Sequence, residues 1–84
     1  MMYIATCFSH FGAMRMKKLC EEQQWPVRMR PVPRALSSSC GVCVQYESDR
    51  YCPLPEVPEE VEQIMIVSDE KNGLYESVYR AEGL

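Results

Sequence analysis

The fold of this chain depends on residues 59–68, which read EEVEQIMIVS. Val61, Ile64 and Met65 recur there at the three- and one-residue intervals that place side chains on one buried helix face. The two glutamates that open the stretch would lie in the first helical turn, where acidic side chains suit the positive end of the helix dipole. The stretch therefore predicts a helix that ends near Asn72-Gly73.

The remaining elements are predicted from hydrophobic periodicity and from the residues that begin or end a helix. Ser9 has a hydroxyl that can cap a helix over residues 10–24, in which Ala13, Met16, Leu19 and Cys20 form the buried face. Pro31 lacks an amide donor, so its strand should lie at an edge of the sheet. The predicted strands are residues 2–8, 27–32, 43–46 and 74–80.

The order of elements is then β-α-β-β-α-β, which short connections and right-handed crossovers convert into one leading arrangement. It is a ferredoxin-like α+β fold, in which a four-stranded antiparallel sheet carries both helices on one face. The 84 residues form one domain, because a chain this short cannot bury two independent cores. In this topology the loop that follows residues 27–32 should meet the start of the first helix.

Composition excludes several classes of protein. The five cysteines are an odd number, which argues against a secreted disulfide framework. The first residues do not form a signal peptide and no stretch is long and apolar enough to span a membrane, so a cytoplasmic protein is expected. Residues 1–50 hold seven Lys and Arg against four Asp and Glu, and residues 51–84 hold two against eight. That basic excess is too small for a nucleic-acid surface.

The most unusual segment is residues 37–43, which read SSSCGVC. Ser38, Ser39 and Gly41 surround Cys40 with small side chains, hydroxyls and open backbone amides that can stabilise a thiolate. Three further groups are expected at the same end of the fold: the start of the first helix, the guanidinium of Arg34, and His10 as a base or ion-pair partner. The alternative interpretation is a flexible serine turn and a solvated histidine.

Cys40 and Cys43 also form a C-x-x-C pair. The pair leads into a strand pattern, whereas the thioredoxin motif opens a helix, so a transient disulfide remains only one possibility. As a zinc or iron–sulfur site the pair supplies half of a tetrahedral shell, which Cys7 and His10 could extend. No metal or other cofactor is expected as the leading interpretation. Cys7 and Cys20 are predicted to be core residues.

Four segments carry a resemblance to a known family: residues 3–10, Lys17-Lys18-Leu19, residues 31–43 (PVPRALSSSCGVC) and residues 73–80 (GLYESVYR). Over nearly the whole chain they resemble the Se/S carrier-like family of small bacterial proteins. The family's name implies a cysteine that carries sulfur or selenium as a persulfide or perselenide, and Cys40 matches that position. The chain departs from the pattern at Cys43 and in the longer proline-rich connection between Tyr51 and Pro58.

Three functions follow as hypotheses. The first is a carrier rather than an enzyme, a monomer or homodimer in which Cys40 accepts sulfur or selenium from a donor protein and passes it to an acceptor protein. The second is a thiol redox switch or metal-binding module that uses Cys40 and Cys43. The third is an interaction domain without covalent chemistry. The chain shows no Ser/His/Asp triad signature, no paired catalytic carboxylates and no glycine-rich phosphate loop.

Overall fold

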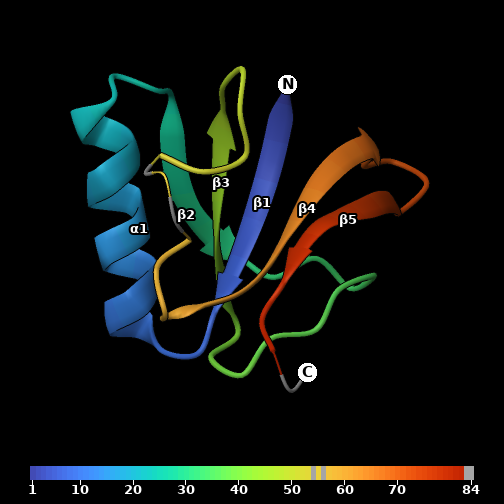
Figure 1. The fold of residues 1–84 in the computed structure, drawn as a ribbon. Helices are drawn as coiled ribbons and strands as arrows, with labels where there is room; N and C mark the ends of the chain where they lie inside the picture. The colour runs from blue at the N-terminus through green and yellow to red at the C-terminus, as the bar shows by residue number, and fades with distance from the viewer. Residues whose placement is uncertain (54, 56, 83–84) are drawn as a thin grey trace.

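The structure is a computed structural model that describes residues 1–53, 55 and 57–82. Its elements are β1 (Met2–Cys7), α1 (His10–Glu22), β2 (Val27–Pro31), β3 (Val42–Glu47), β4 (Val61–Asp69) and β5 (Leu74–Arg80). The strands form one sheet in the order β2-β3-β1-β4-β5, and each neighbouring pair is antiparallel. Figure 1 shows α1 packed along one side of this sheet. The fold is thus α+β, with one helix among the described residues and a five-stranded antiparallel sheet.

The ferredoxin-like prediction is wrong, because residues 61–69 form the strand β4 and not a second helix. The pairing between β1 and β4 shifts register between Thr6 and Cys7: Gln63 pairs with Thr6, but Val61 pairs with Cys7. Glu62 is therefore the extra residue of a β-bulge, and the bulge places Val61 and Ile64 on the same face, three residues apart. A bulged strand thus copies the spacing of a helix, while the β-branched residues after Gln63 favour the strand.

The predictions for the first half of the chain are confirmed in outline. The Ser9 hydroxyl accepts a 3.1 Å hydrogen bond from the Gly12 amide and caps α1. The helix ends two residues before the predicted end, because Gln24 adopts a left-handed conformation (φ 62°) and the Trp25 amide donates back to the Cys20 carbonyl. β2 is an edge strand, as Pro31 predicts.

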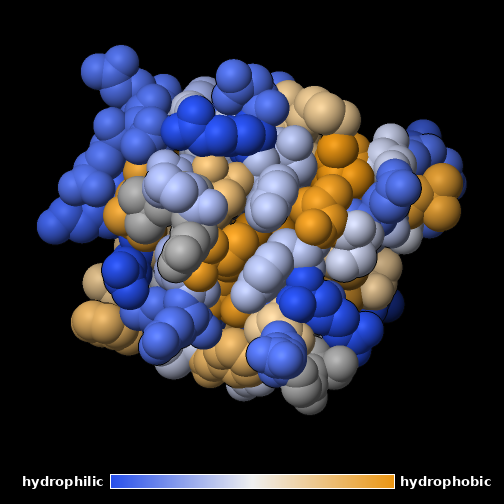
Figure 2. Space-filling model, viewed as in Figure 1, coloured by the Kyte–Doolittle hydropathy of each residue, from blue (hydrophilic) through white to orange (hydrophobic). Residues whose placement is uncertain are grey.

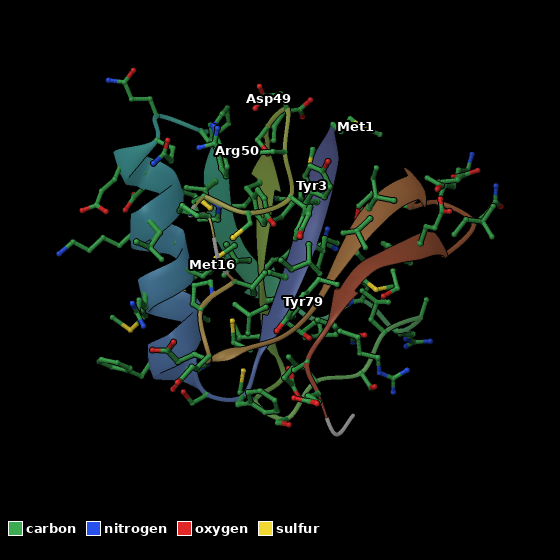
Figure 3. The ribbon with its side chains drawn as sticks, in the orientation of Figure 1. Met1, Tyr3, Met16, Asp49, Arg50 and Tyr79 are labelled. Carbon is green, nitrogen blue, oxygen red and sulfur yellow. The ribbon has the colours of Figure 1, made fainter. Side chains whose placement is uncertain are left out.

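β1 lies at the centre of the sheet and is buried on both faces. Its alternate residues Tyr3, Ala5 and Cys7 belong to the core under α1, where Met16 of the helix is also buried. Figure 3 shows Met16 on the side of α1 that faces the strands. Ile4 and Thr6 point to the opposite face and are nevertheless fully buried, so both faces of this strand are covered. This burial explains why residues 2–7 read as a continuous apolar run.

The connection between β3 and β4 lies on the face of the sheet that α1 covers, where the second helix was predicted (Figure 1). Cys52, Pro53 and Pro58 are buried there, and Val57 packs against the core. Tyr46 stacks on Trp25 with ring centroids 5.8 Å apart, and its hydroxyl donates to the Tyr51 carbonyl. Figure 2 shows hydrophobic side chains in the middle of this face and hydrophilic ones over the upper part of α1, toward its C-terminal end.

Residues 1–53, 55 and 57–82 contain no helix that is long and apolar enough to cross a membrane.

Candidate functional site

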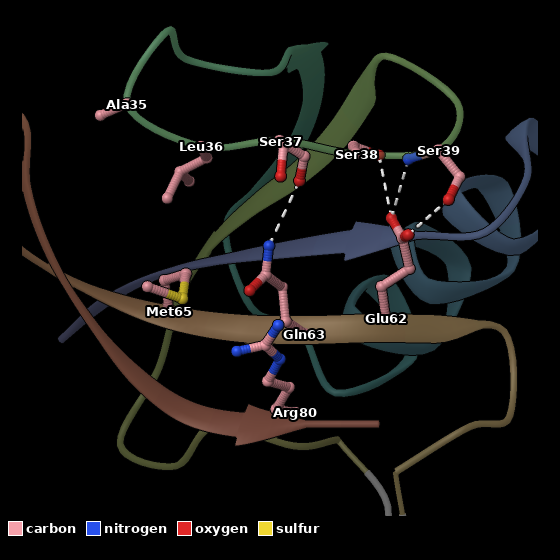
Figure 4. Close-up of a pocket in the computed structure, with 9 residues that line it drawn as sticks. All are labelled: Ala35, Leu36, Ser37, Ser38, Ser39, Glu62, Gln63, Met65 and Arg80. Atoms are coloured by element: carbon pink, nitrogen blue, oxygen red, sulfur yellow. Dashed lines mark hydrogen bonds between the residues drawn. The ribbon is translucent and has the colours of Figure 1, made fainter. Parts of the chain in front are cut away.

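The loop between β2 and β3, residues 32–41, lies over the face of the sheet opposite α1. The Val32 amide donates to the Gly41 carbonyl at 3.2 Å, which closes the loop at its base. At its far end Ala35 lies beside the β4–β5 turn, where a Cβ on Gly73 would lie 3.4 Å from the Ala35 Cβ. The loop therefore crosses the sheet from β2 to the tip of the β4–β5 hairpin, and Figure 4 shows the groove beneath it.

Cys40 lies near the end of this loop, against the end of β1. Its Sγ is 3.3 Å from the Cys7 carbonyl oxygen and 3.4 Å from the Val42 carbonyl oxygen. Both oxygens are acceptors, so these contacts suit the protonated thiol as a donor. The Ser38 hydroxyl lies 3.8 Å from the same Sγ and accepts a hydrogen bond from the Cys40 amide at 3.3 Å. Cys40 is the one partly exposed residue among the five cysteines; the others are buried.

Glu62 holds the serine run to the sheet. Its side chain is 5% exposed, and its carboxylate accepts hydrogen bonds from the Ser38 hydroxyl (3.1 Å), the Ser39 amide (3.2 Å) and the Ser39 hydroxyl (2.6 Å). The next residue, Gln63, donates to the Ser37 carbonyl at 3.2 Å. Successive side chains of a regular strand point to opposite faces, so the bulge is what lets both neighbours reach one loop (Figure 4).

Glu62 was not among the residues selected from sequence. The interpretation of residues 59–68 as a helix assigned its buried face to Val61, Ile64 and Met65 and gave Glu62 no role. A signal existed, since an acidic residue interrupts an apolar stretch that is otherwise suited to a buried strand. A carboxylate at such a position needs hydrogen-bond partners, and Ser38 and Ser39 supply them.

The thiols of Cys7, Cys20 and Cys43 are kept protonated by their surroundings. Burial, together with the neighbouring Cys40 and Glu62, raises the pKa of Cys7 to about 12. Burial likewise raises the pKa of Cys20 to about 12. The pKa of Cys43 is raised to about 11 by burial, although Arg30 nearby lowers it. The Cys43 Sγ lies 3.8 Å from the Pro31 carbonyl oxygen, and its strand partner is Thr6, so it points to the face opposite α1.

The predicted binding residues divide into two groups. Ser38 and Ser39 lie at Glu62, and Ser38 also contacts Cys40. Gly41 follows with a left-handed backbone (φ 74°), which glycine adopts without strain. His10 and Arg34 are exposed, and neither makes a hydrogen bond or ion pair with any residue in the described part of the chain. The structure thus brings the serines to Cys40 but does not bring these two side chains into contact with it.

The groove beneath the loop has a volume of about 520 Å³. It is lined by Ala35, Leu36, Ser37, Ser38, Ser39, Glu62, Gln63, Met65 and Arg80. Beyond it, Arg30 of β2 donates to Gln45 of β3 and pairs with Glu70 at the β4–β5 turn, both at 2.7 Å. This ion pair links an edge of the sheet to the hairpin tip, so the face opposite α1 is concave.

No group of three or more His, Cys, Asp or Glu side chains among the described residues is arranged to hold a metal ion. The zinc or iron–sulfur alternative required Cys7 and His10 beside the C-x-x-C pair. His10 is exposed, whereas Cys7 and Cys43 are buried, and none of these described residues belongs to such a group.

The fold and site define a small α+β domain that presents a half-buried cysteine on a serine-rich loop. The chain matches the family described as "Putative Se/S carrier protein-like" over residues 2–80, and it belongs to that family. No curated protein and no solved structure matches it.

Proposed function

We propose that the protein carries sulfur or selenium on Cys40 as a persulfide or perselenide and passes it between a donor protein and an acceptor protein. The proposal rests on a difference in exposure and thiol pKa among the cysteines. Cys40 is partly exposed on a loop of small residues, whereas Cys7, Cys20 and Cys43 are buried thiols with raised pKa values. The family to which the chain belongs supports the same chemistry.

The transfer exchanges one sulfur–sulfur bond for another. The Cys40 thiolate attacks the outer sulfur of a donor persulfide, a new bond forms between these two sulfurs, and the donor's own sulfur–sulfur bond breaks. Its electron pair leaves with the inner sulfur of the donor, which becomes a thiolate. The donor sulfur is reduced to the thiol level and the Cys40 sulfur is oxidised to the persulfide level, so no external oxidant is needed.

Three exposed apolar side chains close in sequence to Cys7 support a protein as the donor. Phe8, Phe11 and Met14 are 42%, 73% and 61% exposed. Phe8 follows Cys7, whose carbonyl contacts Cys40, and the other two lie at the start of α1 with helical spacing. Large apolar side chains that gather on a surface mark contacts with other proteins more often than chance exposure does. A partner that covers these side chains would bring its own sulfur close to Cys40.

Intact-protein mass spectrometry tests the proposal. The protein is treated with a cysteine desulfurase and L-cysteine, and a gain of about 32 Da, one sulfur, is expected, or about 79 Da with a selenium donor. Cys40→Ser should lose the gain, and the control Cys20→Ala, at a buried thiol, should keep it. An unmodified wild-type protein, or a gain that survives in Cys40→Ser, would contradict the proposal.

A further inference from the structure

Cys40, Ser38 and Glu62 form a continuous chain of contacts from the loop to the sheet. The Cys40 Sγ lies 3.8 Å from the Ser38 hydroxyl oxygen, which lies 3.1 Å from the Glu62 Oε1. The Ser38 hydroxyl has one proton and two acceptors within reach, Glu62 and the Cys7 carbonyl at 3.4 Å. The carboxylate is the nearer and the charged acceptor, so the proton points to Glu62. The Ser38 oxygen then offers a lone pair to the Cys40 S–H, which must turn to it from the nearer carbonyl oxygens of Cys7 and Val42.

We propose that Glu62 takes up the proton of Cys40 through Ser38 when the thiolate forms. Glu62 touches no reacting atom, so it is a positioning residue that acts through the serine. The inference rests on the proposed function, because it supplies the nucleophile that sulfur transfer requires. It names a proton acceptor that the local sequence around Cys40 does not contain.

The step is balanced in protons. The thiol proton moves to the Ser38 oxygen while the Ser38 hydroxyl proton moves to Glu62, so the serine ends as it began. Cys40 becomes a thiolate, and the buried carboxylate becomes a neutral carboxylic acid. After the donor's sulfur–sulfur bond breaks, the proton returns by the same route to neutralise the donor thiolate. The negative charge thus moves from Glu62 to sulfur, and no second buried anion is created beside the first.

Ser39 and the strand fix the acceptor in place. The hydroxyl and amide of Ser39 donate to the two oxygens of Glu62, which holds Oε1 toward Ser38. A base that is held rigidly within hydrogen-bond reach needs no reorganisation at the moment of transfer. The Cys40 amide in turn donates to the Ser38 oxygen at 3.3 Å, so the serine is fixed from both sides.

Other titratable groups surround this chain of contacts. They are Cys7 on β1, Cys43 on β3, Arg80 on β5 at the groove, Glu60 ahead of β4, and Arg15 of α1, which pairs with Glu60 at 2.8 Å. The thiols of Cys7 and Cys43 have pKa values raised to about 12 and about 11, so they stay neutral near pH 7. Glu60 has a lowered pKa because Arg15 hydrogen-bonds to it, so it stays ionised. Among these groups, Glu62 is the carboxylate that Ser38 links to Cys40.

The test is the pH profile of Cys40 alkylation by iodoacetamide, measured on the peptide that contains Cys40. With an internal base, the rate of the wild-type protein keeps a component that does not change with pH, because the thiol proton passes to Glu62 and not to solvent. In Glu62→Gln, which keeps the size of the side chain, the rate should instead fall about tenfold for each pH unit below neutrality, so that it drops below the wild-type rate at the acidic end of the range. Ser38→Ala should give the same steep profile while it leaves the Ser39–Glu62 contacts intact.

Gln63→Leu is the matched control, because Gln63 holds the same loop through Ser37 without touching Cys40. It should keep the wild-type profile. Parallel profiles in the wild type and Glu62→Gln, a faster reaction in Glu62→Gln at the acidic end of the range, or a wild-type profile in Ser38→Ala would each overturn the proposal. Alkylation involves no sulfur donor, so loss of sulfur loading with an unchanged pH profile counts against the carrier function alone.

Discussion

The Ser39 hydroxyl donates a 2.6 Å hydrogen bond to the Glu62 carboxylate across 23 residues of sequence. This contact joins the loop that carries Cys40 to the bulge of β4. The sheet thereby holds the loop in position, and the loop supplies the hydrogen-bond donors that the buried carboxylate needs. Stability and site geometry are therefore coupled at this pair.

Glu62→Ala should lower the free energy of unfolding. The substitution leaves the hydroxyls of Ser38 and Ser39 and one backbone amide without their acceptor, at a cost of about 1–3 kcal/mol. Urea unfolding followed by circular dichroism measures this change. Glu76→Ala on β5, where the side chain is exposed, should stay within about 0.5 kcal/mol of the wild type. Equal midpoints for the two variants would mean that Glu62 does not hold the loop.

Thr6→Val should raise the stability. The Thr6 hydroxyl is fully buried on β1 and has no hydrogen-bond partner in the described part of the chain. Valine has the same shape without the polar group, so it removes the desolvation cost of about 1 kcal/mol. Thermal unfolding should shift upward for Thr6→Val and downward for Thr6→Ser, which keeps the hydroxyl and loses the methyl group. A lower melting temperature for Thr6→Val would show that the hydroxyl is satisfied.

Gly12→Ala should be destabilising although alanine favours helices. A Cβ at Gly12 would lie 2.6 Å from the Glu60 Cβ and 3.4 Å from the Cys7 Cβ. The start of α1 would have to move away from the sheet, at a cost of about 1–3 kcal/mol. Denaturant unfolding compares it with Lys18→Ala at an exposed position of the same helix, for which a change within about 0.5 kcal/mol is expected. A Gly12→Ala protein as stable as the control would exclude this close approach.

Alkaline pH should weaken the fold. In the unfolded chain the thiols of Cys7, Cys20 and Cys43 ionise near pH 9, whereas burial raises their native pKa values to about 12, 12 and 11. Above pH 9 the native state binds more protons, so the free energy of unfolding falls as pH rises toward those values. Denaturant unfolding from pH 7 to about pH 10 should show this fall, and Cys20→Ala should make it shallower. An unchanged slope in that variant would argue that Cys20 ionises freely in the native protein.

Most individual elements could be predicted from local signals. Ser9 marked the start of α1, Pro31 marked an edge strand, and the alternation over residues 74–80 matched β5. The same local signals predict a helix where the bulge at Glu62 lies in β4. One extra residue in a strand changes the two-residue spacing of its buried side chains into the three-residue spacing of a helix. A bulge is set by pairing with β1, which local periodicity does not contain.

The candidate site divides in the same way. Cys40 and its flanking serines are neighbours in sequence, so the small-residue motif was enough to select them. Glu62 is 24 residues from Ser38, and it reaches Ser38 only because β4 is a strand. The wrong prediction of a helix therefore left this buried carboxylate out of the predicted site. Arg34 and His10 were selected from a topology that placed them near Cys40, but both side chains point into solvent.

Cys40 is the residue that we propose holds the transferred atom. The most direct measurement is peptide mapping by mass spectrometry after the folded protein has been loaded with sulfur and all remaining thiols have been blocked. One additional sulfur is expected on the peptide that contains Cys40, with the buried residues Cys7, Cys20 and Cys43 recovered without it. Sulfur on one of these buried cysteines, with Cys40 recovered as an unmodified thiol, would contradict the proposal.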